Sequence, residues 1–223
     1  MPDNKKTARI AGVWWLLFIL IGPISYLFVD GKLLVSDDTA ATLGNIHSNM
    51  ALFWAGTAAF LAGYVCFILL ANALYRLFQT VDSRLARWMR GLVAAGTALV
   101  LIGKALEIAA ANISNIEDAA SLFSLRTSIE MMGELFWGLW LIPLVMLIFQ
   151  SNLIPKAIGG ALSLAAVYHL VAFGAFFIGG VDVSAHPVLV ILGLGELVMV
   201  LWLLIKGVKE QSKTSVGSIE SIP

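Results

Sequence analysis

Six stretches of about 20 apolar residues constrain this chain more than any other feature. They occupy residues 10–28, 51–75, 88–110, 129–149, 157–178 and 187–205. A helix of about 20 residues crosses the roughly 30 Å hydrocarbon core of a bilayer. Lipid offers no hydrogen-bond partners to an open backbone, so a spanning segment is a helix or a strand of a closed barrel, and these runs do not alternate as barrel strands do. The sequence therefore predicts an all-α polytopic membrane protein with six transmembrane helices in one bundle.

The composition agrees with lipid as the main solvent. Hydrophobic residues make up 60% of the 223-residue chain and charged residues 13%, whereas about a quarter of the residues are charged in soluble proteins. The 14 basic and 14 acidic side chains balance, which argues against a nucleic-acid partner. Cys66 is the single cysteine, so no intrachain disulfide is expected.

The distribution of lysine and arginine predicts the orientation. If the N-terminus is cytoplasmic, the outer segments hold only Lys32 and Arg126, while the cytoplasmic segments hold Lys5, Lys6, Arg9, Arg76, Arg84, Arg87, Arg90, Lys156, Lys206, Lys209 and Lys213. The positive-inside rule then predicts a cytoplasmic (inner) membrane protein with both termini in the cytoplasm. Residues 1–208 are expected to form the transmembrane domain. Residues 209–223 are polar and serine-rich, which predicts a disordered cytoplasmic tail.

The first outer segment, residues 30–49, contains the signals of a helix start. Ser36 is a suitable N-cap, and Asp37 and Asp38 follow where the helix dipole favours negative charge. We expect a short helix that lies at the outer membrane interface and seals that end of the bundle. The alternative is that Asp37, Asp38 and His47 bind a ligand at the outer surface.

Prolines and glycines predict local features of the spans. Pro23 and Pro143 interrupt the first and fourth spans, either as kinks or as breaks of the kind that inverted-repeat transporters have at their binding sites. Gly96 and Gly103 are seven residues apart on one face of the third span. Glycines in this arrangement allow a neighbouring helix to approach closely.

Five charged residues and one histidine fall within the predicted spans. Ionisable groups at membrane depth are costly and are candidates for a functional site by default. Helical spacing of three or four residues places two pairs of them on shared faces. Their expected depths agree, so we expect them to line one polar cavity that opens outward: Lys104, Glu107, Glu130, Glu134, His169 and Glu196. One lysine does not balance four carboxylates, so at least one of Glu134 and Glu196 is expected to be protonated or to bind a cation.

These residues favour binding or transport of a small cation or polar solute, with possible coupling to protons. One alternative is an intramembrane metal-dependent hydrolase that uses carboxylates and His169 on a lipid. Another is a non-catalytic accessory or sensor subunit, in which the charges hold the helices together. His-Glu-x-x-His, Gly-x-Ser-x-Gly and the glycine-rich phosphate motifs are absent from the sequence. We therefore assign no catalytic residue, metal ligand or cofactor, and expect membrane lipid and a small solute as the partners.

Three segments also resemble a known family. They are LLVSDDTAATLGNI after the first span, LFWGLWLIPLVMLIFQSNLIPKAIGGAL from the fourth span into the fifth, and GELVMVLWLLIKGV at the end. In this order they resemble the bacterial multi-pass membrane family known as domain-of-unknown-function family 4386, over about residues 9–208. The family usually shows Pro-Gly-Asp where this chain has Ser36-Asp37-Asp38, and Tyr or Arg where it has Gln150. The resemblance implies a six-span bacterial membrane protein and no established reaction.

Overall fold

The computed structural model describes residues 4–183 and 186–209, and all regular secondary structure in these residues is helical. The predicted tail therefore lies outside the described residues, except for Lys209. The elements are α1 (Asn4–Pro23), η1, a π-helix (Ile24–Asp30), α2 (Gly31–Leu33), α3 (Thr39–Ser48), α4 (Met50–Phe78), α5 (Ser83–Ala111), α6 (Ile116–Gln150), α7 (Lys156–Gly179), α8 (Pro187–Gly193) and α9 (Gly195–Ile205).

Five helical segments in the described residues are long and apolar enough to cross a membrane. They are Asn4–Leu33, which combines α1, η1 and α2, and the four helices α4, α5, α6 and α7. Each contains one of the first five predicted spans. The chain is thus an all-helical, multi-pass membrane protein.

The sixth apolar stretch, residues 187–205, is not one continuous helix as the sequence predicts. Helix α8 ends at Gly193 and α9 begins at Gly195, with Leu194 between them. A Cβ atom on Gly195 would lie 2.1 Å from the carbonyl oxygen of Ala161. The regular helix is thus interrupted at Leu194, next to the point where the backbone of Gly195 touches that of α7, a contact that only glycine permits.

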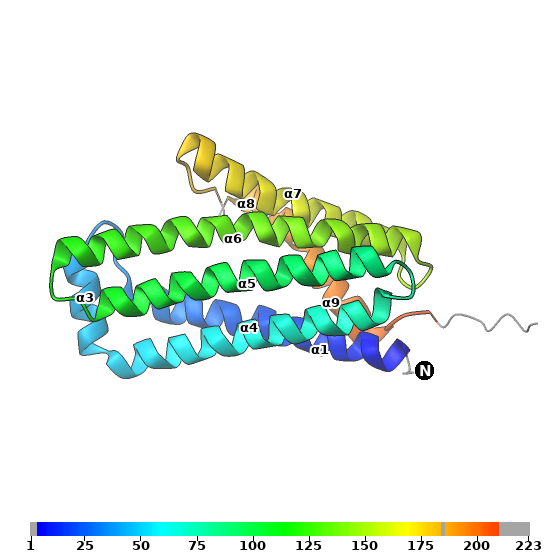
Figure 1. Cartoon of the computed structure of the whole chain (residues 1–223), viewed down its shortest axis with the longest axis horizontal. Coiled ribbons are helices and arrows are strands. Elements are labelled where there is room, and N and C mark those ends of the chain that lie inside the picture. Colours follow the sequence, from blue (N-terminus) through cyan, green and yellow to red (C-terminus); the bar gives the residue numbers. More distant parts are fainter. Residues whose placement is uncertain (1–3, 184–185, 210–223) are drawn as a thin grey trace, which may run out of the picture.

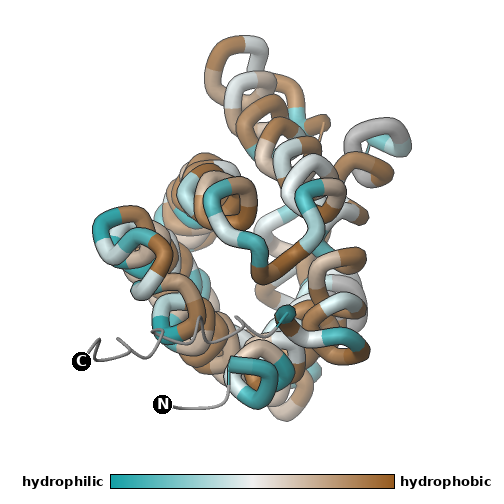
Figure 2. The backbone as a smooth tube through the Cα atoms, turned by 90° about the vertical axis from the view of Figure 1, so that its right-hand side faces the viewer, coloured by the Kyte–Doolittle hydropathy of each residue, from teal (hydrophilic) through white to brown (hydrophobic). Residues whose placement is uncertain are grey.

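The long helices form a closed ring in the order α1, α4, α5, α6, α7 and α9. Neighbours in this order pack against one another, and α9 closes the ring because it contacts both α7 and α1. Figure 1 shows α5 and α6 side by side, with α3 at one end of the bundle and the N-terminus at the other. Viewed along the helices, hydrophilic residues concentrate in the connecting segments and hydrophobic residues in the helix bodies (Figure 2).

Glycine and aromatic side chains set the helix spacing. Helix α5 approaches α6 at Gly96, where a Cβ atom would lie 2.7 Å from Cβ of Phe136, and again at Gly103. The prediction of close packing at these two glycines is confirmed. Trp15 and Trp140 are fully buried, and their ring centroids lie 5.4 Å apart between α1 and α6.

The two prolines behave differently from each other. Helix α6 continues through Pro143 without a break. Pro23 instead ends α1, and the π-helix η1 follows it. Because a π-helical turn is wider than an α-helical one, it shifts the register of the side chains that come after it. The chain then passes close to α4, where the Ser25 hydroxyl donates to the carbonyl of Gly56 over 3.0 Å.

The short helix after the first span is present as α3, but its N-cap differs from the predicted one. The carboxylate of Asp38, not Ser36, accepts from the backbone N–H of Ala41 over 2.8 Å. Asp37 has a positive φ of 60° in the turn before it. Nε2 of His47 lies 2.9 Å from the carbonyl oxygen of Ala111, at the C-terminal end of α5. Asp38 and His47 thus secure α3 across the end of the bundle.

Candidate intramembrane polar site

The six predicted site residues divide between two clusters. The arginine cluster consists of Asp30, Lys104, Glu107, Arg126 and Glu130. The histidine cluster consists of Trp15, Glu134, His169 and Glu196. The expectation that all six line a single cavity is therefore not confirmed.

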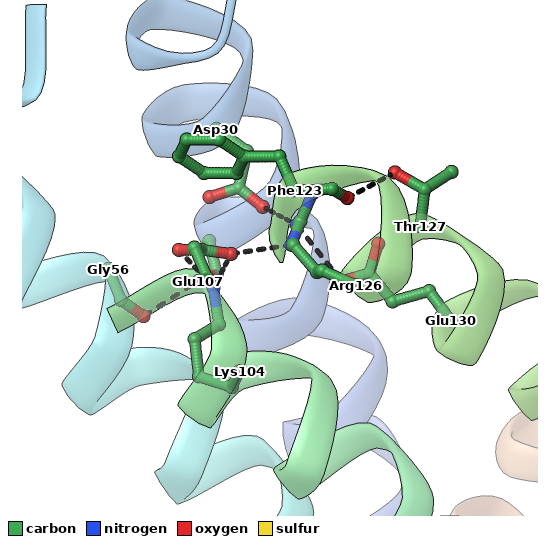
Figure 3. A network of polar contacts seen from close by, with 9 residues as sticks. Asp30, Gly56, Lys104, Glu107, Phe123, Arg126, Thr127 and Glu130 are labelled. Carbon is green, nitrogen blue, oxygen red and sulfur yellow. Dashed lines mark hydrogen bonds and ion pairs between the residues drawn. The ribbon is translucent and has the colours of Figure 1, made fainter. Parts of the chain in front are cut away.

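Arg126 is the centre of the arginine cluster (Figure 3). Its Nη2 atom lies 2.9 Å from Glu130 Oε1 and 3.2 Å from Asp30 Oδ2. Its Nε atom lies 2.7 Å from Glu107 Oε2, as an ion pair without hydrogen-bond alignment. Lys104 Nζ lies 2.8 Å from both oxygens of Glu107. The cluster thus joins η1, α5 and α6 through one continuous set of ion pairs.

Local sequence explains the two ion pairs of this cluster that form within a single helix. Lys104 and Glu107 are three residues apart on α5, and Arg126 and Glu130 are four apart on α6, so each pair shares a helix face. Gly103 lets α6 lie close to the first pair. The Lys104 ammonium also lies 4.7 Å from the centre of the Phe60 ring. Pairing is required because a buried charge without a partner is strongly unfavourable.

Two members of this cluster, Arg126 and Asp30, are not among the site residues that the sequence predicts. The sequence predicts Arg126 in an outer loop, whereas α6 begins at Ile116 and buries it. The signal was available, because Asn115 is an N-cap that accepts from the N–H groups of Glu117 and Asp118. The sequence predicts Asp30 at the start of the outer segment, and no local signal indicates that its carboxylate contacts Arg126 of α6, 96 residues away.

The arginine cluster has an excess of acid. Two cationic and three anionic side chains leave a net charge of −1 when all are ionised. Arg126 already contacts three carboxylates, so it is not available to hold an additional anion. A proton or a cation would neutralise the cluster, whereas an anionic ligand would add to its excess charge.

A pocket of about 610 Å³ leads from the α3 end of the bundle to this cluster. Its wall is formed by residues 34–38 before α3, by Thr39 and Thr42 of α3, by part of α6 and by Phe176 of α7. Arg126 belongs to the lining, but Lys104 and Glu134 do not. The pocket therefore reaches the arginine cluster on its Arg126 side only.

The histidine cluster connects four helices. Nδ1 of His169 on α7 lies 2.6 Å from Glu134 Oε2 on α6, and its Nε2 lies 3.1 Å from Glu196 Oε1 on α9. The second oxygen of Glu196 accepts from Nε1 of Trp15 on α1 over 3.3 Å. Glu196 lies in the first turn of α9, which packs against both α7 and α1.

The contacts of His169 imply a proton count. A carboxylate only accepts hydrogen bonds, and a neutral imidazole has a single N–H group. To satisfy both ring nitrogens, the trio of His169, Glu134 and Glu196 must hold two protons. The second proton resides either on the ring, as imidazolium, or on one carboxyl group. Both arrangements leave the trio with a net charge of −1.

The same contacts disfavour a metal centre at His169. A histidine that binds a metal turns one nitrogen toward the ion and donates the other to a second group. Here both nitrogens face carboxylates on opposite sides of the ring. No group of three or more histidine, cysteine, aspartate or glutamate side chains suited to a metal occurs in the described part of the chain.

The profile of a family described as a domain of unknown function (DUF4386) matches residues 10–207. The chain belongs to the DUF4386 family. No curated protein and no solved structure matches it. Both polar clusters lie entirely within the DUF4386 domain.

One helix of this DUF4386 domain joins the two clusters. Arg126, Glu130 and Glu134 follow one another at intervals of four residues on α6, so each is about 6 Å further along the helix than the last. The pocket, the arginine cluster and the histidine cluster thus succeed one another along α6.

Proposed function

We propose that this DUF4386 protein binds a small cation or cationic solute from the outer side of the cytoplasmic membrane and couples its binding or transport to protons. The observation that carries this proposal is the buried acidic excess. The arginine cluster and the His169 trio each have a net charge of −1 within an apolar bundle. Such charge favours a cation or an additional proton.

The proposal includes a topology of six spans. Helices α8 and α9 together form the sixth, interrupted at Leu194. Both termini are cytoplasmic, since the basic residues gather at the end of the bundle that holds the N-terminus and the α4–α5 connection. Helix α3 then lies at the outer interface, and the 610 Å³ pocket opens outward.

The order of groups along α6 suggests a route. A solute that enters the pocket first meets Arg126, whose partners Glu130 and Asp30 supply negative charge. One turn further, Glu134 begins the histidine cluster. In this cluster each ring nitrogen of His169 contacts one glutamate. Movement of a proton between His169 and a glutamate changes which of these two hydrogen bonds joins charged groups. Because α9 is held to α7 partly through Glu196, such a change is able to alter the packing of the broken span.

Two alternatives make different predictions. An accessory or sensor subunit would use the clusters only to hold helices together, which the extensive pairing of Arg126 supports. A metal-dependent hydrolase would need an accessible histidine nitrogen, and the contacts of His169 do not favour it.

A flux assay in proteoliposomes tests the proposal. Vesicles that contain pyranine are given an outward or inward gradient of Na⁺, K⁺ or tetraethylammonium, and the internal pH is followed. We expect cation-driven proton movement with the unaltered protein and its loss in Glu134→Gln and Glu196→Gln. Glutamine retains an acceptor oxygen, for Trp15 in the case of Glu196, but it cannot titrate.

The matched control is Glu117→Gln, an exposed change in the first turn of α6. It should leave both flux and thermal stability unchanged. If none of the three cations moves protons, and Glu196→Gln leaves the infrared carboxyl absorption of the protein unaltered between pH 5 and 8, the proton-coupled proposal fails and the structural role remains.

A further inference from the structure

A second cavity lies at the opposite end of the bundle from α3. It is a groove of about 320 Å³ between the C-terminal half of α4 and the N-terminal half of α5. The residues of its lining that matter here are Ile68 and Asn72 from α4, and Arg87, Arg90, Gly91 and Ala94 from α5. None of them belongs to the two polar clusters.

The groove changes character along its length. Because α4 and α5 are consecutive and antiparallel, the two arginines lie near the α4–α5 connection and Ala94 and Ile68 lie deeper. Arg87, Gly91 and Ala94 follow at helical spacing, so the basic mouth continues into a floor without large side chains. The result is a groove with a cationic entrance and a mostly apolar deeper part.

Both arginines are exposed at this entrance. Arg87 donates to the Ser83 hydroxyl over 3.4 Å, and the Arg90 guanidinium lies 4.3 Å from the centre of the Tyr75 ring. No carboxylate within residues 4–183 and 186–209 forms an ion pair with either of them. The nearby carboxylate of Asp82 caps α5 by accepting from the N–H groups of Arg84 and Leu85.

We propose that this α4–α5 groove binds one anionic glycerophospholipid. Arg87 and Arg90 hold its phosphate, and an acyl chain lies along Gly91, Ala94 and Ile68. Lipid is the occupant because the groove lies on the membrane-facing surface, where Trp88 and Ile68 are 66% and 40% exposed. Basic pockets between transmembrane helices are known to select anionic headgroups over neutral ones.

The site is independent of the proposed transport function, since it shares no residue with either polar cluster. Its electrostatic part has a definite size. A basic side chain near a membrane surface contributes roughly five- to sixfold to the binding of an anionic lipid, so removal of both arginines should weaken binding about 30-fold at low ionic strength.

Gly91 provides a second way to test the groove. A Cβ atom at this position meets nothing within 4 Å, so a larger side chain here starts in open space at the wall of the groove. Gly91→Leu should therefore block the acyl chain while leaving both arginines in place. Gly160 on α7 also faces open space, and Gly160→Leu is the matched control for the effect of leucine on helix stability.

The experiment measures lipid binding to the purified full-length protein in detergent. Phosphatidylglycerol and phosphatidylcholine with identical acyl chains are titrated, and bound lipid is counted by native mass spectrometry. We expect the protein to retain phosphatidylglycerol preferentially. Arg87→Gln with Arg90→Gln should reduce that binding about 30-fold, and Gly91→Leu should abolish it. Arg84→Gln, which lies outside the groove, and Gly160→Leu should bind as the unaltered protein does.

Three outcomes would overturn the site. Equal retention of the two lipids would remove the charge selectivity. A loss with Arg84→Gln as large as with the double variant would indicate a diffuse surface charge instead of a site. Unaltered binding by Gly91→Leu would show that no acyl chain occupies the groove. Thermal unfolding of every variant without lipid identifies any that is misfolded. If the Arg87→Gln, Arg90→Gln variant is misfolded, the variant Arg87→Lys with Arg90→Lys replaces it. This variant keeps both positive charges and should retain preferential binding of phosphatidylglycerol; loss of that preference in a folded lysine variant would overturn the site.

Discussion

Replacement of Arg126 by methionine is the most direct test of the buried ion pairs. Arg126 is 7% exposed and pairs with Asp30, Glu107 and Glu130. Its removal changes the net charge of the arginine cluster from −1 to −2 when the carboxylates are ionised. Loss of one partner from a buried ion pair typically costs about 3–5 kcal/mol. Because Glu107 keeps Lys104 as a partner and the Glu130 side chain is 24% exposed, we expect the lower end, about 3 kcal/mol.

The assay is thermal unfolding in detergent, followed by tryptophan fluorescence. For a chain of this length about 3 kcal/mol corresponds to a fall in Tm of roughly 6–12 °C. The loss should be smaller at pH 5 than at pH 8, because protonation of the carboxylates removes the excess charge that Arg126 neutralises. Arg84→Met, an exposed arginine on α5, is the control and should change Tm by no more than about 2 °C.

A second substitution tests the pairing itself. Arg126→Met combined with Glu130→Gln returns the cluster to a net charge of −1 and keeps the Lys104–Glu107 pair. We expect the double variant to regain at least about 1 kcal/mol relative to Arg126→Met alone. If Arg126→Met unfolds at the same temperature as the Arg84 control, or if the double variant is no more stable than the single one, the side chains do not form the ion pairs described.

Three further predictions follow. Lys104→Met should lower the Tm in detergent, and added Glu107→Gln should recover part of the loss; an unchanged Tm in the double variant relative to the single one would contradict the pair. Gly195→Ala should cost about 1–3 kcal/mol, because its Cβ would lie 2.1 Å from Ala161 oxygen, whereas Gly160→Ala should not destabilise. A cysteine at Asp182, with Cys66 replaced by serine, should react with a membrane-impermeant maleimide in intact cells; reaction only after permeabilisation would refute the proposed topology.

Local sequence determined the helices and two of the ion pairs, Lys104–Glu107 on α5 and Arg126–Glu130 on α6. Segments of about 20 apolar residues become helices in lipid because the backbone has no other partner than itself, whatever the neighbours are. For the same reason the first five predicted spans each lie within one of the long apolar segments. The Lys104–Glu107 contact was predictable because both residues share one helix face, three positions apart.

Local signals were less reliable where several patterns compete. Ser36 and Asp38 are both good N-caps, and the positive φ of Asp37 decides in favour of Asp38. Hydropathy located the sixth apolar stretch but not its interruption. Next to that interruption the backbone of Gly195 contacts the backbone of Ala161, and these two residues are far apart in the sequence.

Only the tertiary structure decided which charged side chains from different helices contact one another. The apolar pattern fixes which residues lie at membrane depth, but not which helix faces which. Packing of η1 against α6 brings Asp30 to Arg126, and the ring closure by α9 brings Glu196 to His169 and Trp15. Each of these contacts joins residues at least 27 positions apart. The sequence therefore determined that the bundle contains buried charge, while the packing of the helices determined that this charge forms two clusters.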